Sequence, residues 1–161
     1  MIKQLQRKPI YLLLFSFLLL VSCLQNQLKL TADDSKQVEK YLDTKIMATS
    51  FGGSVFSANK IFTIEKDKIF LWAYLQEYYI KDGKTVLGSG WSVPLVLNVE
   101  KTQDGINIKS HDAPRDGDLY SEDIKRLFPK EVQQKIFDFP STAETYQLKE
   151  ISLKRSKTLY L

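Results

Sequence analysis

Apolar and polar residues alternate with two different periods, and the change of period separates helical from extended segments. Across residues 32–46, apolar residues recur every fourth position, as expected for an amphipathic helix with one buried stripe. Val38, Leu42 and Ile46 make up that stripe, and acidic residues at the start of the segment favour a helix N-terminus there. Gly52 and Gly53 interrupt the helical pattern.

Between residues 55 and 111 the apolar period is two, which predicts strands separated by tight turns. Four strands are expected, at residues 55–65, 68–80, 91–101 and 106–111. The second carries apolar side chains on both faces, so we expect it to be central and covered on both sides. Gly88-Ser89-Gly90 predicts a bulge or an opening loop before the third strand. Pro94, which has no N–H to donate, predicts an edge or a bulge.

Three helical segments are expected after the strands. Ser121 is expected to cap the first and Pro129 to open the second, while Ser141-Thr142-Ala143-Glu144 reads as a capping box for the last. The last helix should present Tyr146, Leu148, Ile151 and Leu153 to the core.

The predicted fold class is α+β. An N-terminal helix and a four-stranded antiparallel β-meander come first, and C-terminal helices pack on one face of the sheet. By analogy alone, this order is similar to cystatin-like folds and to folds like that of nuclear transport factor 2.

The N-terminus carries the pattern of a secretory signal. Lys3, Arg7 and Lys8 precede an uncharged apolar block at residues 10–24. As a helix this block would extend about 22 Å at ~1.5 Å per residue. The hydrocarbon core of a membrane is about 30 Å thick, so the block fits a signal peptide better than a stable span.

Leu20-Val21-Ser22-Cys23 ends this block and resembles the lipobox of bacterial lipoproteins. That resemblance implies a diacylglycerol thioether on Cys23 and cleavage just before it. The domains are then a signal peptide at 1–22, lipidated Cys23 with a tether at 23–31, and one globular domain at 32–161. The alternative is an uncleaved anchor with an incidental cysteine. Either way, the basic residues favour an extracytoplasmic domain at the cell membrane.

The net charge of the whole chain is more positive than that of the predicted mature domain. The chain has 23 basic and 19 acidic residues. Removal of Lys3, Arg7 and Lys8 nearly balances the two signs, so nothing favours nucleic acid as a partner. Cys23 is the only cysteine, so a lipidated chain would contain no disulfide and no thiol nucleophile. No cofactor is expected apart from the covalent lipid on Cys23.

The densest polar segment runs from His111 to Asp123. Its pattern, His-x-x-Pro-Arg-Asp-Gly-x-x-Tyr-x-x-Asp-Ile followed by Phe128-Pro129, resembles uncharacterised lipoproteins and extracytoplasmic domains of Gram-positive bacteria. Leu71-Trp72-Ala73-Tyr74 and Gly88-Ser89-Gly90 are similar to that group too. The resemblance covers most of residues 50–140. It implies location and a related fold, and no activity.

Three interpretations of this segment remain open. In the first it is structural: Asp116-Gly117 turns the chain, Arg115 pairs with a carboxylate, and Tyr120 packs at the helix entry. In the second it is a cation site, with Asp112, Asp116, Asp118 and Glu122 as oxygen ligands for Ca²⁺. In the third it is a recognition surface, whose candidate residues are His111, Arg115, Asp116, Asp118 and Tyr120.

The residues for catalysis are few, and no catalytic residue is assigned. The chain has one histidine, and Ser89 lacks the strand–turn–helix context of a hydrolase nucleophile. We therefore expect a non-enzymatic binding or sensing module at the cell surface, with a possible protein partner there. The alternative is a metal-dependent enzyme or a Ca²⁺-binding domain that uses residues 111–123. Lys149, Lys154, Arg155 and Lys157 suggest a solvated helix face, or one that touches anionic lipid.

Overall fold

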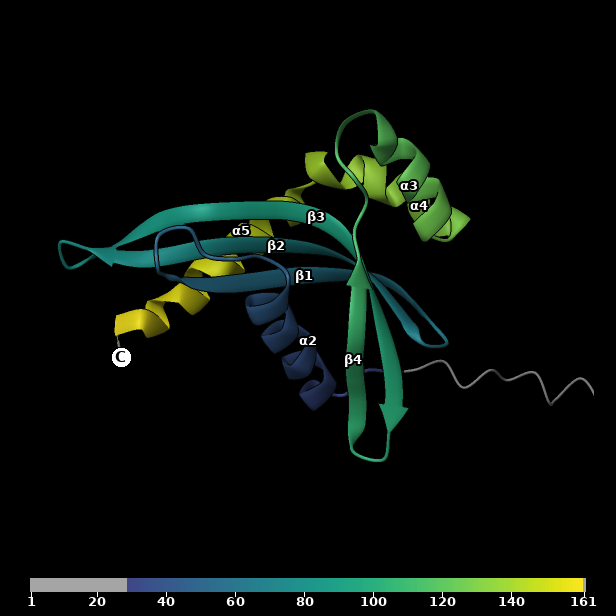
Figure 1. Cartoon of the computed structure of the whole chain (residues 1–161), viewed down its shortest axis with the longest axis horizontal. Helices are drawn as coiled ribbons and strands as arrows, with labels where there is room; N and C mark the ends of the chain where they lie inside the picture. Colours follow the sequence, from purple (N-terminus) through teal and green to yellow (C-terminus); the bar gives the residue numbers. More distant parts are fainter. Residues whose placement is uncertain (1–28, 161) are drawn as a thin grey trace, which may run out of the picture.

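A meander of four antiparallel strands forms the centre of the structure (Figure 1). The computed structural model describes residues 29–160. The predicted signal peptide, Cys23 and most of the tether lie outside the described residues. The main elements are α2 (Ala32–Lys45), β1 (Ser54–Glu65), β2 (Lys68–Lys81), β3 (Lys84–Thr102), β4 (Gly105–Asp112), α3 (Tyr120–Leu127), α4 (Lys130–Asp138) and α5 (Ala143–Ser156).

The strands follow one another in the order β1-β2-β3-β4, and every neighbouring pair is antiparallel. The predicted α+β class, with one helix before the meander and the other helices packed against the sheet after it, is confirmed. Asp82 and Gly83 join β2 to β3 with φ values of 52° and 71°. Positive φ at both central residues is the geometry of the tight hairpin turn that this pair predicts.

The predicted irregularities in β3 are confirmed. The β2–β3 register shifts between Gln76 and Tyr78, opposite Gly88 and Ser89, so the bulge lies at the glycine-rich segment. The strand nevertheless continues through it. Pro94 pairs with β2 on one side, while β4 pairs with β3 only from Val96 onward. The missing N–H of Pro94 therefore falls where β3 has a single neighbour.

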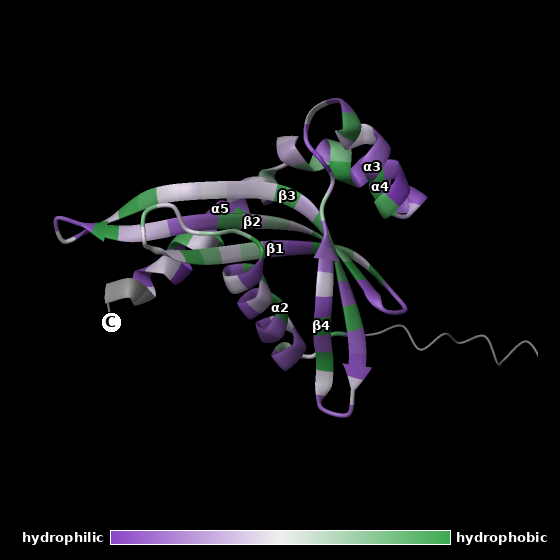
Figure 2. Cartoon of the chain, viewed as in Figure 1, coloured by the Kyte–Doolittle hydropathy of each residue, from purple (hydrophilic) through white to green (hydrophobic). Residues whose placement is uncertain are grey.

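One face of the sheet packs against α2. Thr31 caps this helix: its hydroxyl accepts from Asp34 N, and Asp34 accepts from Thr31 N at 2.8 Å. Val38 and Leu42 are fully buried against inward residues of β2, β3 and β4, as their spacing predicted. Hydrophilic and hydrophobic bands alternate along β4 in Figure 2, as expected for a strand with one covered face.

The opposite face packs against the C-terminal helices. Phe70, Trp72 and Val96 contribute from the sheet. The helices contribute Ile124, Phe128, Val132, Ile136, Phe139 and Leu148. Figure 1 shows α5 passing behind the strands, with α3 and α4 grouped beyond the end of β4. The second strand is therefore central and covered on both faces, as its composition predicted.

Two of the predicted helix caps are wrong. The helix α3 begins at Tyr120 after a 3₁₀ turn, and Ser121 lies inside it. The N-cap of α5 is Thr142, whose hydroxyl donates to Phe139 O at 2.8 Å instead of capping the helix. The preceding 3₁₀ turn at Phe139–Ser141 includes Ser141 and prevents it from serving as the cap. Pro129 stands one position earlier than predicted, as the N-cap of α4.

The predicted buried face of α5 is also wrong. Of the four residues expected to face the core, Leu148 alone is buried, and Tyr146, Ile151 and Leu153 are exposed. The buried face continues from Leu148 through Ser152 and Ser156. Small hydroxyl side chains fit here because Ser152 donates to Phe56 O at 2.8 Å and lies 3.2 Å from the Tyr78 hydroxyl. Among residues 29–160, no helix combines the length and apolarity of a membrane span.

Candidate functional site

Arg115 and Asp123 form the centre of the 111–123 segment. The Arg115 side chain donates from Nε to Asp123 Oδ2 at 2.7 Å and from Nη2 to Oδ1 at 2.9 Å. Its backbone N–H also donates to Oδ2, and Arg126 donates to Oδ1 from the same helix as Asp123. Hydrogen bonds from the two arginines hold the pKa of this buried carboxyl far below its usual range. These contacts fix the loop to α3 and support the structural interpretation of Arg115.

The carboxylates proposed as cation ligands do not gather. Asp112, Asp116, Asp118 and Glu122 are all exposed. Asp112 accepts a hydrogen bond from Asn98 Nδ2 at 2.9 Å, which places it beside β3. Within residues 29–160, no group of three or more histidine, cysteine or acidic side chains is arranged to hold a metal ion. Gly117, at the predicted turn, has a φ of 70°.

His111 and Tyr120, both candidates for one recognition surface, lie on opposite faces of the sheet. The His111 ring is on the α2 face, where its Nδ1 lies 3.0 Å from the Tyr41 hydroxyl. Tyr120 is half-buried in the other core and packs edge-on against Phe137, with ring centroids 6.2 Å apart. The candidate residues therefore do not form one continuous surface.

A second buried carboxylate explains the Gly88-Ser89-Gly90 segment. Glu77 is fully buried and accepts from four backbone N–H groups, those of Ser50, Phe51, Gly53 and Ser89, at 2.9–3.2 Å. Burial alone would raise the pKa of Glu77, but these donors outweigh it and lower the pKa to about 2. A Cβ on Gly88 would lie 2.7 Å from Glu77 Oε2, so this position has room only for glycine.

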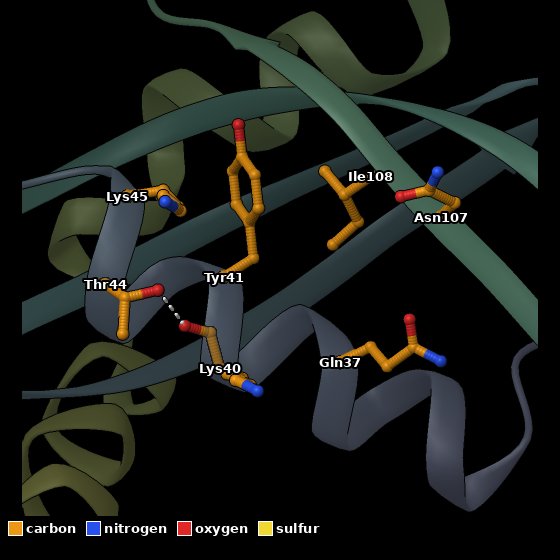
Figure 3. A pocket seen from close by; sticks show the side chains of 7 residues that line it. All are labelled: Gln37, Lys40, Tyr41, Thr44, Lys45, Asn107 and Ile108. Carbon is orange, nitrogen blue, oxygen red and sulfur yellow. Dashed lines mark hydrogen bonds between the residues drawn. The ribbon is translucent and has the colours of Figure 1, made fainter.

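An open groove lies between α2 and β4 on the α2 face (Figure 3). Its volume is about 320 Å³. Figure 3 shows Tyr41 rising from α2 toward β4, and Ile108 pointing back from β4 toward it. The lining side chains combine two ammonium groups, two amides, two hydroxyls and one aliphatic group. They are Gln37, Lys40, Tyr41, Thr44, Lys45, Asn107 and Ile108.

The groove carries uncompensated positive charge. Among the described residues that line it, none is acidic. Within residues 29–160, neither Lys40 nor Lys45 makes an ion pair or a side-chain hydrogen bond. Ammonium groups next to amide and hydroxyl donors suit a carboxylate or phosphate group.

Two acidic residues of α2 that do not line the groove, Glu39 and Asp43, are already paired. Arg155 of α5 contacts Glu39 Oε1 and Asp43 Oδ2, both at 2.7 Å. Asp43 also accepts from Ser57 N at 2.7 Å, and Arg155 donates to Ser57 O at 2.5 Å. This network satisfies the outer edge of β1 and joins α2 to α5. It also neutralises Glu39 and Asp43, so these two carboxylates do not pair with Lys40 or Lys45.

Sequence patterns did not reveal the groove. The spacing of Gln37, Lys40, Tyr41 and Thr44 places them on one helix face, but a solvated face has the same spacing. The groove exists because that face lies beside Asn107 and Ile108, and no local pattern predicts this pairing of α2 with β4. His111, a predicted site residue, contacts the groove residue Tyr41.

Comparison of the chain with protein-family models, with curated proteins and with solved structures yields no match.

Proposed function

We propose that the chain is a lipid-anchored extracytoplasmic lipoprotein whose domain binds a ligand at the cell surface. The observation that carries the proposal is Leu20-Val21-Ser22-Cys23 at the end of an apolar block that follows three basic residues. Two acyl chains hold a protein stably at a membrane where one does not. The tether that follows Cys23 is short, so the domain stays near the bilayer.

The anchor is tested by replacing the residue that would carry the lipid. Cys23→Ser is expected to abolish incorporation of labelled palmitate and to leave a precursor with its signal peptide attached. Ser22→Ala is the matched control, because it keeps a small residue before the cleavage site and should be labelled and processed normally. Equal labelling and equal mass for Cys23→Ser and the unmodified chain would disprove the anchor.

Within this module, the α2–β4 groove is the place where the ligand binds, and the ligand carries a carboxylate or phosphate. Lys40 and Lys45 support this, because both lie at the groove without an acidic neighbour in its lining. Tyr41 and Ile108 add a small apolar surface beside the charge. The ligand thus combines an anionic group with a short apolar part, which also describes an acidic side chain of a protein partner.

Titration with small anions tests the groove directly. Inorganic phosphate and succinate serve as probes, with backbone amide shifts measured by NMR. Shifts are expected at Lys40, Lys45 and Asn107, and Lys40→Gln with Lys45→Gln should abolish them. Lys36→Gln is the matched control, because Lys36 lies on the same helix but pairs with Asp33 at 2.9 Å. Identical titrations for the double variant and for Lys36→Gln would rule out the groove.

A further inference from the structure

Tyr146, Ile151 and Leu153 are exposed apolar side chains on α5, and they flank its outermost positions, which are polar or charged (Gln147, Glu150, Lys154 and Lys157). The side chains of Tyr146, Ile151 and Leu153 are 73%, 49% and 39% exposed. The inward face of the helix is already occupied by Leu148, Ser152 and Ser156. Because no further element of the described chain packs on this side, the three exposed apolar groups contribute nothing to either core.

Lysines lie between and beside these apolar side chains. Lys149, Lys154 and Lys157 are exposed, and within residues 29–160 none of them forms an ion pair or a hydrogen bond through its ammonium group. Of the acidic residues in α5, Glu144 is paired with Lys60 at 2.7 Å, which leaves Glu150 alone against the lysines. Apolar and tyrosine side chains among unpaired lysines fit the headgroup region of an anionic bilayer.

The end of α5 also lies within reach of the proposed anchor, and this step rests on the proposed function. Arg155 contacts Asp43, which lies twelve residues after Thr31 on α2. At ~1.5 Å per residue, that contact is roughly 18 Å from the point where the tether joins the helix. Eight extended residues between Cys23 and α2 span about 27 Å. The tether is therefore long enough to bring Cys23 level with the end of α5 that contacts Asp43.

We propose that the outer face of α5 rests on the anionic surface of the membrane. Tyr146, Ile151 and Leu153 enter the headgroup region, and Lys149, Lys154 and Lys157 lie against lipid phosphates. This contact presents the sheet face that carries α2 and the groove away from the bilayer, because α2 and α5 cover opposite faces. The lipid anchor then fixes the distance of the domain from the membrane, and α5 fixes its orientation.

Photocrosslinking of the full chain in vesicles tests this orientation. Tyr146 is replaced by the photoreactive aromatic residue benzoylphenylalanine, and Phe51 is replaced in the same way as the matched control. Phe51 is also aromatic and 58% exposed, but it stacks on Tyr79 on the α2 side of the sheet. In vesicles of equal parts phosphatidylglycerol and phosphatidylcholine, lipid crosslinks at position 146 should exceed those at position 51 at least several-fold.

Charge dependence separates a headgroup contact from simple proximity. The yield at position 146 should fall several-fold in pure phosphatidylcholine, and also after Lys149→Gln, Lys154→Gln and Lys157→Gln are introduced together. Equal yields at positions 146 and 51, or a yield at 146 that ignores both changes, would overturn the proposal. Crosslinks from position 146 to a second copy of the chain would also overturn it.

A mass measurement on the reconstituted chain shows separately whether it has been cleaved and lipidated. If the chain is neither cleaved nor lipidated, the proposed function fails. The alternative of an uncleaved anchor at residues 10–24 would keep such a chain on the vesicle, and the crosslinking yields would then still decide the orientation of α5.

Discussion

The face of α5 that is buried differs from the face that hydropathy predicts, and this difference can be tested by its effect on stability. Leu148 is 5% exposed and packs in the core that contains Trp72. Leu148→Ala removes three carbon atoms, which at ~0.8 kcal/mol each is a transfer loss of about 2.4 kcal/mol. A partly collapsed cavity adds to this, so we expect the free energy of unfolding to fall by about 3 kcal/mol.

Tyr146→Ala is the control, because Tyr146 lies two residues earlier on the same helix and is 73% exposed. Its removal should change the free energy of unfolding by less than about 0.5 kcal/mol, although tyrosine is the larger side chain. Urea unfolding of a chain that begins at residue 29, followed by tryptophan fluorescence, measures both values. The dependence of the free energy on urea should stay constant, because neither change alters the surface exposed on unfolding.

Comparable losses for the two variants would refute this account of α5. A large loss for Tyr146→Ala with little loss for Leu148→Ala would mean that the helix is rotated by about half a turn. The outer face would then be part of the core, and the proposed membrane contact would fail with it.

Three further changes test the buried polar contacts. The pKa values of Glu77 and Asp123 are lowered in the folded chain. The stability that these two carboxylates provide is therefore fully present above their unfolded pKa values, near ~4, and is lost as the pH falls toward 2. Melting temperatures should fall steeply across that window and stay nearly flat above it. Arg155→Ala should lower the free energy of unfolding in urea by about 2 kcal/mol, because it removes hydrogen bonds from a charged donor. Lys60→Ala is the control and should lower it by under ~1 kcal/mol, because the ion pair of Lys60 is nearly half exposed. Gly88→Ala should destabilise the chain by about 1–3 kcal/mol because its Cβ would meet a carboxylate that four N–H groups hold in place; unchanged unfolding would show that Glu77 can move.

The strand region was predictable because its signals are local. Apolar side chains on both faces of β2 predicted a central strand covered on both sides, and Asp82-Gly83 favours a tight hairpin through backbone preferences alone. The bulge at Gly88 was predictable for the same reason. What no local signal revealed was its cause: the partner of these glycines is Glu77, whose carboxylate also binds the loop that precedes β1.

The C-terminal helices were harder to orient, because their environment is set by distant residues. A rule based on hydropathy assigns Ile151 and Leu153 to the core and Ser152 to solvent. The structure reverses this, because Ser152 meets the Phe56 carbonyl and the Tyr78 hydroxyl, which lie more than 70 residues away in the chain. A serine hydroxyl can be buried at little cost once it is hydrogen-bonded, and a hydropathy scale does not take such bonds into account.

The polar residues that stand out in the sequence have structural partners, and this changes where a function should be sought. Arg115 is held by Asp123, and the glycines of the bulge accommodate Glu77 and Gln76. A resemblance based on these residues therefore carries information about the fold, since their loss would first damage folding. Substitutions there cannot separate function from stability. The lysines of the groove and of α5 are the opposite case, because they are exposed and belong to neither core. Their substitution should cost little folding stability, so a phenotype at these positions would report function directly.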